Sequence, residues 1–172
     1  MKKFWIQPLV NAISAIDEWS SYIDLNVVTP PPRVSVHLGV FVEPYLSFIF
    51  DGTKTVESRF SINRCAPFGV ANEGDVLLLK QAAGPVVGLC RIATVWSYRV
   101  TPETMGELQL RFEDAMCALD PTFWTERSKA GYATLMQIHR VSRIVPFEIE
   151  KRDRRGWVVI TKRSKQLRLW DE

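Results

Sequence analysis

The side chains best suited to chemistry in this sequence lie in a polar segment at 51–60. It places Lys54 before a run in which Thr55, Glu57 and Arg59 alternate with other residues. Alternate side chains of a β-strand point to the same face, so a hydroxyl, a carboxylate and a guanidinium would share one face. Such a face can bind phosphate or carboxylate and can hydrogen-bond the edge of a nucleobase. The competing interpretation is a solvated strand face with a cross-strand ion pair.

Most other catalytic patterns are missing from the sequence. It has no glycine-rich phosphate loop, no nucleophile elbow and no metalloprotease motif. Its two histidines, His37 and His139, each lie in a strand-like run, where a structural or surface role is the more common one. We therefore expect neither a metal site nor a cofactor.

Short strands and helices must position the polar segment. A helix is expected at 43–50, ended by Gly52, and a strand then opens at 55–60. The other expected elements are strands at 34–40, 76–80, 86–100, 132–145 and 157–161, and helices beginning at Thr101 and Asp120. The apolar alternation slips near 137–141, which predicts a bulge. This order predicts an α+β fold, a small mixed β pseudo-barrel with surrounding helices.

Three consecutive prolines after an N-terminal helix indicate the clearest boundary. We expect an N-terminal helix and proline-rich linker at 1–33, the main domain at 34–161 and a basic tail at 162–172. The helix, expected at 8–24, has one apolar face. That face can pack on its own domain, on a second copy of the chain as a homodimer, or on a protein partner. Trp5, Trp19 and Tyr22 look exposed.

Composition and charge favour one ordinary folded domain. The chain has 172 residues, 47% of them hydrophobic and 24% charged, with a net charge of +3. The positive charge is unevenly distributed along the chain, because residues 151–172 hold eight basic and three acidic side chains. Such a cluster predicts salt-sensitive attraction to nucleic-acid phosphates. A solvated turn at 151–155 is the alternative.

The sequence gives no sign of export or of membrane insertion. No stretch approaches the ~20 apolar residues of a membrane helix, and polar residues interrupt the N-terminal segment. The three cysteines are an odd number and make no disulfide framework. We therefore expect a cytoplasmic protein without a membrane partner.

The polar segment also resembles a family motif, Gly-x-Lys-x-x-Glu-x-Arg, of the ASCH domain family within the PUA-like superfamily. The four matching residues are Gly52, Lys54, Glu57 and Arg59. Pro44-Tyr45 is similar to the proline–aromatic pair that often opens the first helix of the family. Gly74-Asp75-Val76 is similar to the family's entry to the next barrel strand. The resemblance covers residues 34–161.

This resemblance implies a cleft between the first helix and the motif strand that faces RNA or a modified nucleoside. Tyr45 would lie near the cleft, where an aromatic ring can stack on a base. Lys54 and Arg59 would contact phosphate or base, and Glu57 would orient them or accept a hydrogen bond from a base amino group. Trp124 and Trp157 are further candidate stacking platforms, with a core role as the alternative.

The resemblance leaves open whether the protein is an enzyme. Some ASCH-like proteins resemble amidohydrolases acting on N4-acetylcytidine, and ribonuclease activity has been proposed within the family. Lys54 would match the catalytic lysine of the amidohydrolases and Glu113 their helical carboxylate. That subgroup has a threonine where this sequence has Glu57. A lysine accepts a proton at neutral pH only where its surroundings disfavour the charged form. This mismatch favours binding over hydrolysis.

Overall fold

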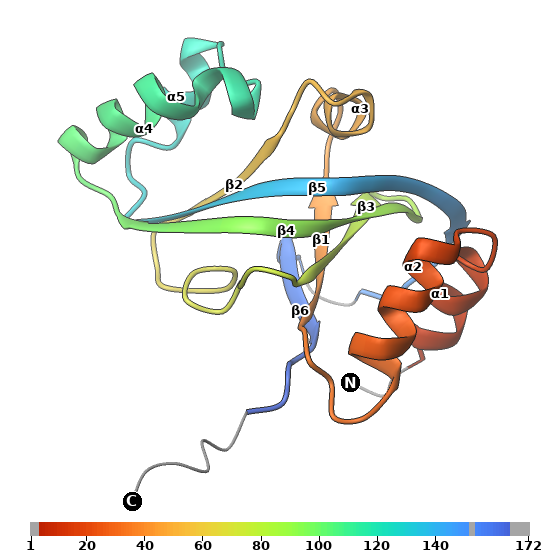
Figure 1. Ribbon diagram of the computed structural model, residues 1–172. Helices are drawn as coiled ribbons and strands as arrows, with labels where there is room; N and C mark the ends of the chain where they lie inside the picture. Colours follow the sequence, from red (N-terminus) through yellow and green to blue (C-terminus); the bar gives the residue numbers. More distant parts are fainter. Residues whose placement is uncertain (1–3, 152–153, 166–172) are drawn as a thin grey trace, which may run out of the picture.

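The computed structural model describes residues 4–151 and 154–165, which form a curled, mixed six-stranded sheet with helices around it (Figure 1). The strands are β1 (Val36–Phe41), β2 (Val56–Ser61), β3 (Val76–Gln81), β4 (Val86–Arg99), β5 (Tyr132–Phe147) and β6 (Trp157–Thr161). Their order is β2-β5-β4-β3-β1-β6. The β1–β3 pair is parallel and the other pairs are antiparallel. The predicted α+β fold, a small mixed β pseudo-barrel with surrounding helices, is confirmed.

The helices cover opposite ends of the two long strands. They are α1 (Ile6–Ala12), α2 (Asp17–Ile23), the π-helix η1 (Asp24–Val28), α3 (Tyr45–Asp51), α4 (Pro102–Met116) and α5 (Pro121–Glu126). Figure 1 shows α4 and α5 at one end of β4 and β5, and α1 and α2 at the other. Thr101 and Asp120 cap α4 and α5 as predicted, because their side chains accept backbone N–H groups of the first turn. None of the described helices has the length and apolar character needed to cross a bilayer.

The predicted irregularity in the last long strand is a bulge between β4 and β5. Leu89 pairs with Ser142, whereas Arg91 pairs with His139. The pairing therefore advances by two residues along β4 and by three along β5. Arg140 lies within this step and has a positive φ of 54°. A bulge increases the local twist, which helps the sheet to curl.

The N-terminal segment is not the single helix predicted at 8–24. Ile16 leaves the helical conformation, with φ −117° and ψ 88°, and separates α1 from α2. The change of direction allows Leu9 in α1 and Ile23 in α2 to be buried in one core with Val36 of β1 and Leu78 of β3. The helical segment therefore packs on the sheet of its own chain.

Two N-terminal tryptophans correct the sequence interpretation. Trp5 and Trp19, expected to be exposed, retain only 5% and 2% of their accessible surface. Trp19 also donates a hydrogen bond to the Ser142 hydroxyl at 2.9 Å. These rings belong to the core. The division of the chain at residues 33 and 161 stays a prediction, and residues 166–172 of the predicted tail lie outside the described residues.

Candidate functional site

A cavity of about 240 Å³ lies against β2 and receives side chains from the β1–α3 connection, α3 and α5. Four of the predicted site residues line it: Tyr45, Lys54, Glu57 and Arg59. They are brought together by one helix, one turn and one strand. Gly52 ends α3 in a left-handed conformation with φ 84°, which a glycine adopts without steric cost, and turns the chain into β2.

Lys54 is a buried cation whose hydrogen-bonding capacity is used within the protein. Its ammonium group donates to the carbonyl oxygens of Val56 at 2.8 Å and Met116 at 3.0 Å. It also lies 3.4 Å from Glu57 Oε2. The ammonium group therefore uses two of its three N–H donors in hydrogen bonds and meets Glu57 as an ion pair. Met116 ends α4, where a cation is favoured by the helix dipole.

Glu57 lies between two cations and is only 5% exposed. Arg59 Nε is 2.9 Å from its Oε1, while the Lys54 ammonium approaches Oε2. Burying a carboxylate is costly unless it is paired, and these two contacts provide the compensation. Both ion pairs are formed by the buried Glu57 and lie within β2 and the turn before it, not across strands as the solvated-face alternative expected.

Arg59 is held in one orientation by backbone carbonyls and aromatic rings. Its terminal nitrogens donate to Val40 O at 3.1 Å and to Gly156 O at 3.2 Å. The guanidinium lies 5.0 Å from the ring centre of Phe41 and 5.2 Å from that of Trp157. Such cation–π contacts favour a fixed, planar cation.

The other wall of the cavity is aromatic and carries an arginine that sequence reasoning missed. Tyr45 and Phe123 have ring centres 6.5 Å apart. The Arg127 guanidinium lies 3.6 Å from the Phe123 ring centre and donates to the Phe123 carbonyl at 2.8 Å. Burial lowers the pKa of Arg127, but a guanidinium remains charged at neutral pH. No local sequence signal indicates Arg127, because it reaches the cavity from the position directly after α5.

Two predicted site residues do not line this cavity. Thr55 is exposed, and its backbone N–H pairs with Ala115 O. Glu113 lies part-buried on α4, and no ion pair joins it to Lys54 among the described residues. The end of α4 reaches Lys54 through the Met116 carbonyl instead.

The two further candidate stacking platforms have structural contacts. Trp124 is 6% exposed and donates from its indole nitrogen to Ala118 O at 2.8 Å. Trp157 is 5% exposed and flanks Arg59. Neither tryptophan lines the cavity.

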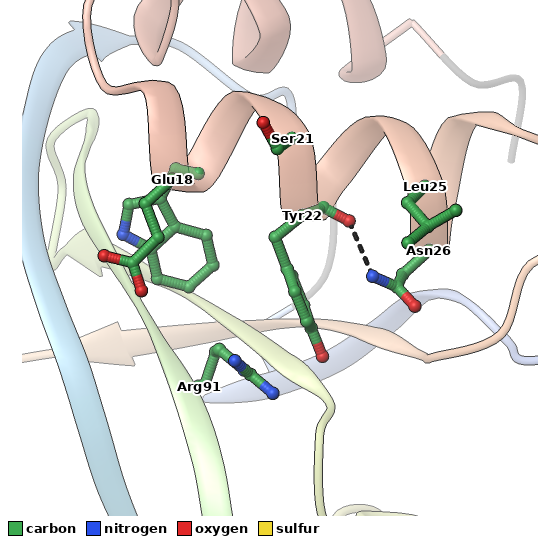
Figure 2. A pocket seen from close by; sticks show the side chains of 7 residues that line it. Glu18, Ser21, Tyr22, Leu25, Asn26 and Arg91 are labelled. Carbon is green, nitrogen blue, oxygen red and sulfur yellow. Dashed lines mark hydrogen bonds between the residues drawn. The ribbon is translucent and has the colours of Figure 1, made fainter.

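A second cavity, of about 310 Å³, lies between α2 and β4 (Figure 2). Trp19, Tyr22 and Leu25 supply its apolar walls, and the Arg91 guanidinium lies 4.0 Å from the Tyr22 ring centre. Burial raises the pKa of Tyr22, partly offset by Arg91, and the hydroxyl donates to Gly74 O at 2.6 Å. None of the predicted site residues lines this cavity.

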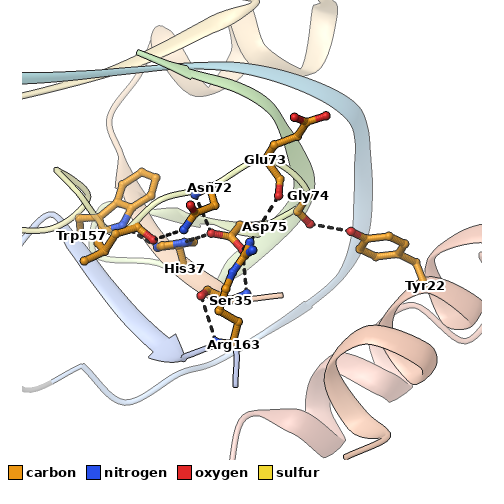
Figure 3. Close-up of polar contacts among 10 residues, drawn as sticks. Tyr22, Ser35, His37, Asn72, Glu73, Gly74, Asp75, Trp157 and Arg163 are labelled. Carbon is orange, nitrogen blue, oxygen red and sulfur yellow. Dashed lines mark hydrogen bonds and ion pairs between the residues drawn. The ribbon is translucent and has the colours of Figure 1, made fainter. Parts of the chain in front are cut away.

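A second buried carboxylate, Asp75, organises the other side of the sheet (Figure 3). Its Oδ1 accepts from Ser35 N at 2.8 Å and from an Arg163 terminal nitrogen at 2.6 Å. Its Oδ2 accepts from His37 Nε2 at 3.0 Å and from Asn72 N at 2.8 Å. Burial raises the pKa of Asp75, but these donors outweigh it, so the pKa lies below its usual value.

His37 links this carboxylate to the candidate site. The Trp157 indole N–H donates to His37 Nδ1 at 3.1 Å, so the proton of the neutral ring is on Nε2, which donates to Asp75. His37 is fully buried and its two ring nitrogens are both engaged. Across the described residues no cluster of three metal-ligating side chains occurs.

The fold, but not the sequence, matches known proteins. No family model matches the chain, and no curated protein matches it. The ASCH protein of Zymomonas mobilis aligns with a TM-score of 0.53 at 14% identity, over 66% of this chain and 73% of that chain. A mutant form of that protein aligns with a TM-score of 0.58 at 12% identity, over 74% of this chain and 89% of that chain.

A protein from another bacterium has the same fold. Protein EF3133 of Enterococcus faecalis V583, a DUF984 protein, aligns with a TM-score of 0.51 at 11% identity, over 83% of this chain and 99% of that chain. Likeness at these identities establishes architecture. The chain has the fold of ASCH domain proteins, as its motif predicted.

Proposed function

We propose that this ASCH-fold protein binds single-stranded RNA and holds one nucleotide base in the cavity against β2. The observation that carries the proposal is Glu57, a buried carboxylate fixed by Lys54 and Arg59 at the wall of a cavity whose other side is aromatic. A rigid acceptor beside stacking surfaces suits a base that has left its own stack.

The charge of the cavity suits a nucleotide. Lys54, Arg59 and Arg127 line it with positive charge, and Glu57 carries the negative charge among its lining residues. Tyr45 offers a ring at the cavity wall, and base–aromatic stacking contributes ~1–3 kcal/mol per base. Arg127 uses one N–H on Phe123 and has further donors for a phosphate. The basic residues near the C-terminus would add attraction without base selectivity.

Hydrolysis of a modified nucleoside or of RNA is the weaker candidate. Lys54 donates to two backbone carbonyl oxygens and its ammonium group faces Glu57 as an ion pair, so its contacts lie within the protein. Glu113 does not line the cavity, so the lysine–carboxylate pair of an amidohydrolase is not assembled. A modified nucleoside remains an alternative ligand for binding.

The proposed setting is the cytoplasm. Cys65, Cys90 and Cys117 are all free thiols, a state that a reducing compartment maintains. Homodimer formation and a protein partner through the 8–24 segment are not part of the proposed function, because the buried apolar residues of that segment pack on its own sheet.

Fluorescence anisotropy with labelled single-stranded RNA tests the proposal. We expect binding at low salt that weakens as salt increases, and Tyr45→Ala to weaken it about tenfold through lost stacking. Tyr98→Ala is the matched control, because Tyr98 is also part-buried but does not line the cavity. Absence of binding at low salt, or equal affinity of the two variants, would contradict the proposed site.

A further inference from the structure

We infer that the cavity selects guanine over the other RNA bases, because Glu57 presents two adjacent acceptor sites to it. This inference rests on the proposed function and specifies the base. It follows from counting which hydrogen-bonding groups of the wall are already used and which remain for a ligand.

Glu57 retains acceptor capacity that the protein does not use. An ionised carboxylate has about four lone-pair sites, two on each oxygen. Oε1 lies 2.9 Å from Arg59 Nε and Oε2 lies 3.4 Å from the Lys54 ammonium; both contacts are ion pairs, and no hydrogen bond from a described residue reaches either oxygen. At least one lone-pair site on each oxygen therefore remains, and Glu57 lines the cavity.

Both cations beside Glu57 have donors engaged elsewhere, two of the three on Lys54 and two of the five on Arg59. Lys54 uses its other two N–H groups on Val56 O and Met116 O. Arg59 uses its terminal nitrogens on Val40 O and Gly156 O. Glu57 therefore supplies the charged acceptors of this wall.

Only one of the four RNA bases matches two acceptors side by side. Guanine presents N1–H and the 2-amino group together on its Watson–Crick edge. Adenine and cytosine place a ring-nitrogen acceptor next to their amino group, and uracil flanks its single N–H with two carbonyls. These acceptors would face a carboxylate oxygen and be repelled. Charge-assisted hydrogen bonds are roughly twice as strong as neutral ones, so the mismatch matters.

The rest of the cavity fits a guanine nucleotide. Tyr45 is part-buried and lines the cavity, so its ring is the candidate stacking surface for the purine. Arg127 lines the same cavity and can contact the phosphate. The two cations on Glu57 keep its charge compensated before the ligand arrives, so the acceptor is preorganised.

The test uses the wild-type protein and a series of short oligouridylates with one central base replaced by guanine, hypoxanthine, adenine or cytosine. Hypoxanthine keeps N1–H but lacks the 2-amino group. We expect guanine to bind tightest and hypoxanthine about tenfold more weakly, from the loss of one hydrogen bond to a charged group. Adenine, cytosine and the all-uracil strand should bind more weakly still.

The outcomes separate the inference from the proposed function. Equal binding of all strands, or a preference for another base, overturns guanine selection while RNA binding stands. Failure of every strand to bind at low salt overturns both. Equal affinity for guanine and hypoxanthine overturns the paired-acceptor geometry.

A variant provides a second readout. Glu57→Gln keeps the size of the side chain but replaces one acceptor with a donor, so the guanine-to-hypoxanthine ratio should fall to about one. Glu148→Gln is the matched control, because Glu148 is exposed after β5 and does not line the cavity. An unchanged ratio in a folded Glu57→Gln protein overturns the inference. If this variant does not fold, the wild-type series decides.

Discussion

Asp75 and Glu57 are both buried carboxylates that contact an arginine, yet they are satisfied to different extents. Asp75 is 0% exposed and accepts hydrogen bonds from four protein donors, two on each oxygen. Glu57 is 5% exposed, contacts one protein cation on each oxygen and lines a cavity. A carboxylate with every lone pair used can only hold the fold together, whereas one with spare acceptors beside a cavity can also bind a ligand.

The donors also come from different parts of the chain. Asp75 joins the residue before β1, β1 itself, the loop before β3 and Arg163 beyond β6. Glu57 is held by Lys54 and Arg59, its neighbours in sequence. Asp75 therefore connects distant segments, while the Glu57 group is a local arrangement that the fold encloses. Trp157 lies between them, bonded to His37 and stacked on Arg59.

The largest expected effect is on stability at Asp75. Asp75→Ala leaves four donors without an acceptor, two of them on the buried residues Ser35 and His37, and should lower the free energy of unfolding by about 3–5 kcal/mol. Glu57→Gln retains one acceptor and the side-chain volume, so its loss should be about 1–3 kcal/mol. Urea unfolding of both variants measures the difference.

Asp114→Ala serves as the control for this comparison, because Asp114 is exposed on α4. This substitution should change the free energy of unfolding by no more than about 0.5 kcal/mol. If Asp75→Ala unfolds like Asp114→Ala, the assigned structural role of Asp75 is wrong.

The second prediction concerns acid. Burial raises the pKa of Asp75, whereas hydrogen bonds from His37, Arg163 and Ser35 lower it. The lowering is the larger effect, so the folded pKa lies below the unfolded value of about 3.9. The resulting stabilisation is complete above the unfolded pKa and is lost as pH falls through the folded pKa. The gap in unfolding free energy between wild type and Asp75→Asn should therefore shrink below about pH 4. Urea midpoints along a pH series measure it, and a gap that widens in acid would contradict the sign.

The smallest expected effect is at the residue between the two carboxylates. Trp157→Phe removes the N–H that donates to His37 but keeps a ring beside Arg59. It should cost about 1 kcal/mol of stability and change RNA affinity by less than about twofold. Unfolding and anisotropy measurements on the same preparation test this. Loss of base preference in this variant would mean that the two carboxylate groups act as one unit.

Much of the architecture could be predicted from local pattern. Alternation placed the strands, capping residues placed the starts of α4 and α5, and a slip in alternation located the bulge. The prediction of a single N-terminal helix was wrong, because the chain breaks at Ile16 and both resulting helices pack on the curled sheet. Tertiary packing outweighs helix periodicity in such short helices.

In the candidate site, too, some residues could be predicted from the sequence and others could not. Tyr45, Lys54, Glu57 and Arg59 could be predicted together, because one helix, one turn and one strand bring them to a single cavity. Arg127 could not, since it comes from the position directly after α5 and no motif marks it. Glu113 was placed by its position along a helix, but the direction of its side chain depends on how α4 packs.

The sequence by itself determined the order of the elements, the turn at Gly52 and the grouping of charges on β2. Each depends on residues a few positions apart, whose geometry is governed by local backbone preferences. Only the tertiary structure decided that Lys54 meets the Met116 carbonyl and that Trp157 flanks Arg59. Those contacts join segments distant in the chain, and their approach depends on sheet register, curl and helix packing.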